Sequence, residues 1–248
     1  MAGFISALID FFYPPYCLLC DNRLDGVEKF ICPICWNRLE PAEISEYDLR
    51  RTGGWIDQLV SLAAFREKAF FNELEDEIYE PVMQQMLHLL KYGNKRSLGV
   101  QLGRKLGQVI RRAEWHEAVN RIIPVPLHSV RYRERGYNQS ERIARGVAQV
   151  LNIPVDTTSL KRTKMTQSLT HLNAYERQRT VADAFHIANG SDIDGQVVLL
   201  VDDVFTTGAT LTACARTLKN QGGVAIVMAA TVAKTPLTPK EEEDDGKS

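Results

Sequence analysis

The chain has 248 residues, of which 44% are apolar, so it is long enough to bury a sizeable hydrophobic core. Its 30 basic and 31 acidic side chains nearly balance, which excludes the overall positive charge typical of nucleic-acid-binding proteins. No apolar run reaches the roughly 18 residues of a membrane span, and residues 1–16 lack the basic start and the cleavage site of a signal peptide. We therefore expect a cytoplasmic globular protein without a membrane span.

Four of the five cysteines lie in residues 1–50, which we expect to form a zinc-ribbon segment. They make two C-x-x-C pairs, Cys17 with Cys20 and Cys32 with Cys35. Each pair presents two thiolates on a tight turn, and the two turns can converge on one tetrahedral Zn²⁺. Disulfides, a redox-active pair and a 2Fe-2S centre are the alternatives. The short symmetric spacing favours structural zinc over all three.

The rest of the chain has the pattern of an α/β protein. We expect a strand and an acidic connector in residues 51–82, an α/β domain in 83–236 and a disordered acidic tail in 237–248. The apolar spacing predicts helices over 80–93, 97–115, 138–152 and 208–223, and strands over 121–127, 196–204 and 224–234. On the second helix, the expected buried face comprises Leu98, Leu102, Leu106 and Val109. Continuous apolar strands between amphipathic helices predict a parallel sheet covered on both faces.

A basic segment, RYRERGYN, follows the first expected strand of this domain. Its three arginines stand at alternate positions, at Arg131, Arg133 and Arg135, and a glycine follows them. This spacing does not match a helical period, which favours a mobile loop. Arginine is suited to bidentate contacts with phosphate, so we expect this loop to bind anions.

Two adjacent carboxylates end the expected strand within VVLLVDDVFTTGAT. Asp202 and Asp203 precede a loop with three threonines and one glycine. Parallel sheets bind ligands outside the carboxyl ends of their strands, and a glycine-containing loop at a helix start can bind phosphate. The alternative is a pair of solvated strand-end carboxylates followed by threonines that cap a helix.

The stretch resembles the phosphoribosyl-pyrophosphate (PRPP) binding motif of type I phosphoribosyltransferases. The complete pattern is a run of apolar residues, Asp-Asp, two apolar residues and Thr-Thr-Gly-x-Thr. The resemblance implies that Asp202 and Asp203 are catalytic and contact the 2- and 3-hydroxyls of the ribose, while Mg²⁺ neutralises the departing pyrophosphate. The residues that would cradle the 5-phosphate are Thr206, Thr207, Gly208, Ala209 and Thr210. By analogy with that fold, Leu127 and His128 would face the pyrophosphate. Arg133, Arg135, Asn138 and Gln139 would lie in or beside a hood over the site.

Further motifs extend the resemblance to nearly the whole chain. Together with LKYGN at 90–94, RGYNQS at 135–140 and the paired C-x-x-C motifs, the aspartate motif resembles the ComF family of bacterial competence-associated proteins. That family implies a zinc ribbon before a type I phosphoribosyltransferase domain, and a link to the uptake of transforming single-stranded DNA. The matching segment near 161–185 includes Arg162, Gln167, Arg177 and Phe185, but has Thr180 where the family has asparagine.

Three functions are compatible with these motifs. The first is a PRPP-binding protein that supports DNA uptake through single-stranded DNA contacts made by the zinc ribbon and the arginine-rich segment. The second is a metabolic phosphoribosyltransferase acting on a base or amine, and the third is a non-catalytic PRPP sensor. We favour the first, which gives as partners PRPP or a related sugar phosphate, single-stranded DNA and the DNA-uptake machinery. A homo-oligomer is compatible with the sequence.

Overall fold

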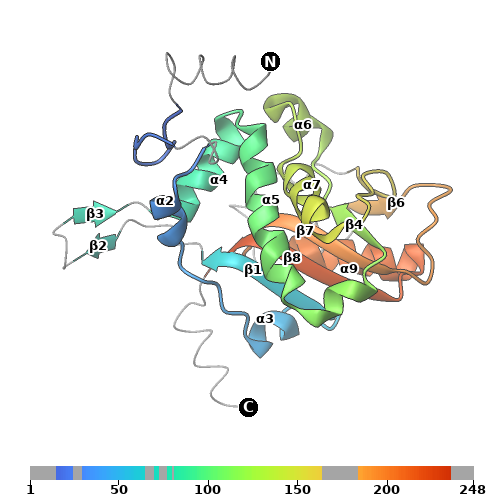
Figure 1. Ribbon diagram of the computed structural model, residues 1–248. Helices are drawn as coiled ribbons and strands as arrows, with labels where there is room; N and C mark the ends of the chain where they lie inside the picture. Colours follow the sequence, from blue (N-terminus) through green and yellow to red (C-terminus); the bar gives the residue numbers. More distant parts are fainter. Residues whose placement is uncertain are drawn as a thin grey trace, which may run out of the picture.

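A four-stranded parallel sheet lies at the centre of the computed structural model, which describes residues 15–24, 30–64, 70–72, 77–79, 81–163 and 184–235 (Figure 1). Its strands follow the order β1-β8-β7-β4. They are β1 (Gln58–Ala64), β8 (Ile226–Lys234), β7 (Val197–Phe205) and β4 (Arg121–Pro124). Their near-continuous apolar sequences suit strands that are buried on both faces. The predicted parallel sheet is confirmed, and its carboxyl ends all meet at one edge.

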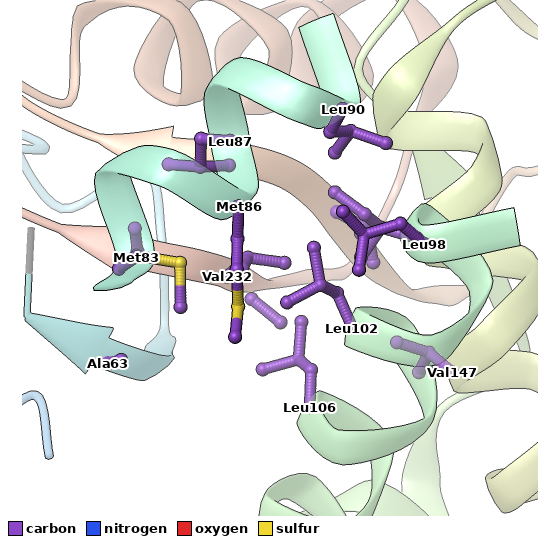
Figure 2. Close-up of a cluster of buried hydrophobic side chains, with 14 of the residues drawn as sticks. Ala63, Met83, Met86, Leu87, Leu90, Leu98, Leu102, Leu106, Val147 and Val232 are labelled. Atoms are coloured by element: carbon purple, nitrogen blue, oxygen red, sulfur yellow. The ribbon is translucent and has the colours of Figure 1, made fainter. Parts of the chain in front are cut away.

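Helices cover both faces of this sheet (Figure 1). One hydrophobic cluster joins the sheet to three of the longer helices, and the other joins it to a fourth. The first three are α4 (Val82–Tyr92), α5 (Arg96–Arg111) and α7 (Gln139–Leu151), and the fourth is α9 (Ala209–Gly222). Figure 2 shows how side chains of α4 and α5 meet beside Val232 of β8. On α5, Leu98, Leu102 and Leu106 are fully buried as predicted, but Ile110 completes the buried face in place of the half-buried Val109.

Helices α5 and α7 approach closely because each contributes a glycine at the crossing. A Cβ added at Gly103 would lie 2.0 Å from the carbonyl oxygen of Ile143, and one at Gly146 would lie 2.2 Å from that of Val100. No side chain can occupy either position without moving the backbone of the other helix. The close contact fixes α7, whose first residues lie at the carboxyl edge of β7.

Smaller elements lie around this framework. They are α2 (Pro33–Asn37), α3 (Glu46–Arg50), the 3-10 helix η1 (Glu114–Ala118), α6 (Ser129–Arg135), and two antiparallel pairs, β2 (Phe70–Asn72) with β3 (Glu77–Tyr79) and β5 (Leu160–Arg162) with β6 (Phe185–Ile187). The connector expected before residue 82 thus contains β2 and β3. Gln167, Arg177, Thr180 and the acidic tail lie outside the described residues, and the domain boundaries at 50, 82 and 236 stay predictions.

The prediction of a loop at 131–138 was wrong, because residues 129–135 form helix α6. His128 caps its first turn and Gly136, with a left-handed φ of 72°, ends it. None of the seven helical residues is buried. A helix that is polar on all sides carries no apolar period, which explains why its sequence did not indicate a helix. In the described part of the chain, no helix combines the length and apolar character that crossing a membrane requires.

Candidate functional site at the carboxyl edge of the sheet

Two buried carboxylates lie near the carboxyl end of the central strand β7. Asp202 is 8% exposed and Asp203 is 7% exposed. Ser140 donates from its hydroxyl to Asp202 Oδ1 over 2.8 Å, and the backbone N–H of Asp203 donates to the same atom over 2.9 Å. Lys91 Nζ lies 3.0 Å from Asp203 Oδ2, to which Gln139 Nε2 also donates over 3.4 Å. The two carboxylates therefore have different partners, and among the described residues only Asp203 forms an ion pair with a cation.

The segment RGYNQS builds the wall opposite these carboxylates. Gly136 ends α6, and the buried Tyr137 donates from its hydroxyl to the backbone carbonyl of Leu90, next to Lys91. Asn138 then caps α7: its Oδ1 accepts from the backbone N–H of Ser140, while its Nδ2 donates to the carbonyl of Val125. These contacts occupy both ends of the Asn138 amide. They orient the first turn of α7 toward β7, which brings Gln139 and Ser140 to the aspartates.

A cavity of about 270 Å³, which we call the Asp203 cavity, opens against this wall. Its lining residues are Lys91, Leu127, His128, Arg131, Arg135, Gln139, Arg162 and Asp203. Four of them are permanent or near-permanent cations, and one is a carboxylate. The imidazole Nδ1 of His128 accepts from the backbone N–H of Val130 over 3.3 Å, so this nitrogen is already occupied. A small cavity with this excess of cations suits a ligand with several negative charges.

Burial has a strong effect on the ionisation of Asp202. Desolvation, followed by repulsion from Asp203, raises the pKa of Asp202 to about 7, although hydrogen bonds from Ser140 and from the backbone of Asp203 and the charge of Lys91 act in the opposite direction. At neutral pH this carboxyl group can therefore either donate or accept a hydrogen bond. Either form can serve a hydroxyl group of a ligand, because a hydroxyl is both donor and acceptor.

The loop that follows β7 has the geometry of a helix N-terminus. Thr206 and Thr207 are exposed, and Gly208 adopts a left-handed φ of 75° directly before α9. A Cβ on Gly208 would lie 3.0 Å from the ring of Phe205, so the loop packs directly on that ring. From the segment before β1, Arg51 donates to the carbonyl of Thr206 over 3.1 Å. The backbone N–H of Ala209 donates to Thr207 Oγ1 over 3.4 Å, and the start of a helix such as α9 is a favourable position for an anion.

The four cysteines form a second site in the segment that precedes the sheet. Their sulfur atoms all lie within 4.8 Å of one another, with 3.8 Å between Cys17 and Cys35 and 3.5 Å between Cys20 and Cys32. Four sulfurs at about 2.3 Å from a tetrahedral zinc ion would be about 3.8 Å apart, whereas a disulfide requires about 2.05 Å. All four are free thiols. The donor set therefore fits a structural zinc ion.

This zinc-binding segment packs against the main body of the molecule. Cys17, Cys35 and Trp36 belong to the same hydrophobic cluster as α4 and α5. Lys105 of α5 places its ammonium group 5.1 Å from the centre of the Trp36 ring, a cation–π contact. The cysteine segment therefore packs against the helices on one face of the sheet.

The structure brings together most of the residues that the sequence singled out, with two differences. Leu127, His128 and Arg135 line the Asp203 cavity, whereas Arg133 lines a neighbouring one. The loop 206–210 continues from the same strand end, but it is not part of the described lining of this cavity. Sequence reasoning did not assign Lys91, Gln139 or Ser140 a contact with the aspartates. The motifs LKYGN and RGYNQS contain all three and were the available signal.

Together, the parallel sheet, the acidic strand end and the four-cysteine cluster define a type I phosphoribosyltransferase fold with an N-terminal zinc ribbon. Family models agree, with a phosphoribosyl transferase domain at residues 138–247 and a double zinc ribbon domain at residues 8–46. The chain is 30% identical to the DNA utilization protein YhgH of Escherichia coli, over 85% of this chain and 86% of that protein. It is 37% identical to Competence protein F of Haemophilus influenzae, over 41% of this chain and 44% of that protein.

These similarities establish that the chain belongs to the ComF family. The relatives differ in how much of their length is matched. The similarity to the DNA utilization protein YhgH of Salmonella typhimurium, at 31% identity, covers 60% of this chain and 66% of that protein, slightly less than two thirds. The match to the Escherichia coli protein, in contrast, extends over 217 residues.

Proposed function

We propose that the protein binds PRPP or a closely related sugar phosphate with Mg²⁺ and that it supports DNA utilisation or uptake through contacts with single-stranded DNA. The observation that carries the first part is the pairing of buried Asp202 and Asp203 with a cation-lined cavity on one side. On the other side of the two aspartates, Gly208 adopts a left-handed backbone conformation directly before α9. Hydroxyl groups, a pyrophosphate and a terminal phosphate each find a suitable partner in this arrangement.

Each group of PRPP has an assigned position in this proposal. Asp202 and Asp203 accept hydrogen bonds from the ribose hydroxyls, and the loop 206–210 holds the 5-phosphate. The pyrophosphate occupies the Asp203 cavity, where Lys91, Arg131 and Arg135 offset its charge. Bound Mg²⁺ would neutralise the pyrophosphate further, and carboxylate and phosphate oxygens are the ligands that this ion prefers.

The ligand-binding proposal is tested by titration calorimetry with PRPP in the presence and absence of Mg²⁺. Asp203→Asn is expected to weaken binding by about tenfold or more, because a hydrogen bond to a charged group contributes about 1.5 to 3 kcal/mol. Asp192→Asn is the matched control, since Asp192 is an exposed aspartate at a distant hollow. Equal affinities in wild type and Asp203→Asn would refute the assignment.

The DNA part of the proposal is supported by the names of the relatives, which refer to DNA utilization and competence. Exposed arginines around α6 supply positive charge next to the candidate site. Binding of a labelled single-stranded oligonucleotide is expected to weaken steeply as salt rises, because each phosphate contact releases a counterion. Absence of binding, or binding that salt does not affect, would contradict this part alone.

Catalytic turnover is a separate question with its own assay. Purified protein, Mg²⁺ and PRPP can be incubated with a panel of bases and amines while released pyrophosphate is measured. Release that depends on both Asp203 and an acceptor would favour a phosphoribosyltransferase enzyme. PRPP binding without release would favour a non-catalytic sensor.

A further inference from the structure

A second cavity, of about 390 Å³, lies beside the Asp203 cavity and shares two of its lining residues, Leu127 and Arg162. We call it the Tyr132 cavity. It falls within the size range of small-molecule sites, which is about 300 to 1,000 Å³. The assignment of PRPP to the Asp203 cavity and the loop 206–210 leaves this second cavity without a ligand.

The sequence of α6 points to a ligand-binding role for its exposed side chains. None of the residues of α6 is buried, so packing against the core does not account for this helix. Tyr132 is 48% exposed although it is a large aromatic residue. It lines the Tyr132 cavity together with the next residue of the helix, Arg133. Within the described residues, Arg133 has neither an ion pair nor a hydrogen bond through its guanidinium group.

Three cations and one carboxylate determine the charge of the Tyr132 cavity. The cations are Arg133, Lys161 and Arg162, and the carboxylate is Glu141. Glu141 is already paired, since Arg145 donates to its Oε1 from two nitrogens over 3.0 and 2.7 Å. Lys161 Nζ donates to the carbonyl of Thr157 over 3.2 Å, which leaves two of its three N–H donors for a ligand. The cavity therefore attracts anions.

The apolar part of the lining fits a planar group. Pro124, Pro126, Leu127 and Leu160 form it, and the exposed Tyr132 ring stands beside them. A ring face next to apolar walls and cations is the combination with which proteins hold a nucleobase and its phosphate.

From this geometry we infer that the Tyr132 cavity is a nucleotide-binding subsite, in which a nucleobase stacks on Tyr132 and the attached phosphate contacts Arg133 and Lys161. The inference rests on the proposed function for the identity of the neighbouring ligand and, where the nucleotide belongs to a strand, for single-stranded DNA as the partner. The nucleotide can be a free mononucleotide or one unit of a single strand. In either case it lies next to the sugar phosphate, with Arg162 between the two ligands.

The test uses the full-length zinc-loaded protein and two probes, deoxyadenosine monophosphate and a single-stranded oligodeoxyadenylate of about ten nucleotides. Tyr132→Ala is expected to weaken nucleotide binding by about fivefold or more, the smaller end of the range for loss of one stacked base. Tyr132→Phe keeps the ring and is expected to retain wild-type affinity. Lys161→Ala is expected to weaken binding and to reduce its salt dependence.

Two exposed residues away from the cavity serve as controls. Ile226→Ala removes an exposed apolar side chain at the opposite edge of the sheet, and Arg216→Ala removes an exposed cation on α9. Neither change should alter nucleotide affinity. Thermal unfolding of each variant verifies folding, and PRPP affinity with Mg²⁺ is measured on the same samples.

The outcomes separate this inference from the proposed function. The inference is supported if Tyr132→Ala loses nucleotide binding while its PRPP affinity equals that of wild type. It is also supported if Tyr132→Ala loses nucleotide binding and neither wild type nor any variant binds PRPP, an outcome that contradicts only the proposed function. Binding of the oligonucleotide but not of the mononucleotide identifies a strand as the source of the ligand. The inference is overturned if wild type binds neither probe, if Tyr132→Ala binds as wild type does, if Tyr132→Phe loses affinity, or if Tyr132→Ala weakens PRPP binding equally.

Discussion

Two buried or partly buried aspartates, at opposite ends of the same sheet, show how different the roles of one residue type can be. Asp156 lies near the amino end of β4 and lines a hollow of about 470 Å³, larger than the cavity against Asp203. Its carboxylate accepts hydrogen bonds from the backbone and hydroxyl groups of Thr158 and Ser159 and forms an ion pair with Arg121 at 3.1 Å. Every acceptor position of Asp156 thus has a partner from the protein itself.

Asp202 has fewer partners and an adjacent like charge. Ser140 and one backbone N–H serve a single oxygen, and no cation lies within ion-pair distance in the described part of the chain. The pKa of Asp202 is raised to about 7, whereas burial tends to raise that of Asp156 but is outweighed by hydrogen bonds, so the pKa of Asp156 lies well below its usual range. The larger hollow therefore surrounds a carboxylate that the protein itself satisfies, whereas the smaller cavity adjoins an aspartate pair in which the pKa of Asp202 is raised. The ionisation of the aspartates, and not the volume of the adjoining cavity, therefore identifies the candidate site.

The largest expected effect is an opposite pH dependence of stability for the two aspartates. Because the pKa of Asp202 is raised on folding, its contribution to the free energy of unfolding is fully present below the unfolded pKa of about 4 and is lost as pH rises through about 7. The contribution of Asp156, whose pKa is lowered, is present above about pH 4 and is lost at more acidic pH.

Urea unfolding of wild type and of two isosteric variants measures these contributions. Relative to Asp202→Asn, wild type should lose up to about 4 kcal/mol of stability between about pH 4 and pH 8. Relative to Asp156→Asn, it should gain stability as pH rises from about 3 to 5. Parallel curves for wild type and Asp202→Asn would show that Asp202 is an ordinary ionised carboxylate, and the contrast between the two ends would then disappear.

A smaller effect is expected when the satisfied aspartate is removed at neutral pH. Asp156→Ala leaves Arg121 and the polar groups of Thr158 and Ser159 without their shared acceptor. The expected loss in free energy of unfolding is about 3 kcal/mol, whereas PRPP affinity should not change. Asp192→Ala, at an exposed position of the same hollow, should change stability by less than about 0.5 kcal/mol. A loss of PRPP affinity in Asp156→Ala would mean that the amino end of the sheet also serves the ligand.

The sequence predicted the framework well because the framework depends on local periodicity. Continuous apolar runs gave β7 and β8, and apolar spacing gave α4, α5, α7 and α9 within a few residues. The zinc-binding cysteines were found by their spacing. The choice of Val109 over Ile110 failed because the buried face of α5 also includes Gly99, Gly103 and Gly107, which centres this face near Leu106 and Ile110 and leaves Val109 at its edge.

Contacts between distant segments could not be predicted in this way. Ser140 reaches Asp202 across 62 positions of sequence and Gln139 reaches Asp203 across 64, and no local pattern reports such a pairing. Helix α6 was missed because it buries nothing, although its end at Gly136 could have been identified by the glycine.

The smallest expected effect compares two glycines with the same backbone conformation at the two ends of the sheet. Gly208 and Gly190 both have a φ of 75°, so alanine at either position should cost about 1 kcal/mol of stability. Only at Gly208 does an added Cβ meet another group, the Phe205 ring at 3.0 Å, while a Cβ on Gly190 has no atom within 4 Å.

The two alanine variants therefore separate backbone strain from ligand binding. Gly208→Ala should displace the loop 206–210 and weaken PRPP binding severalfold, whereas Gly190→Ala should leave affinity at the wild-type value. Chemical denaturation gives the stability of each variant, and calorimetry gives its affinity. If both variants lose affinity equally, the loss follows from general destabilisation, and the loop after β7 is not the phosphate site. If only Gly208→Ala loses affinity, the ligand lies at the carboxyl end of the sheet, next to Asp202 and Asp203.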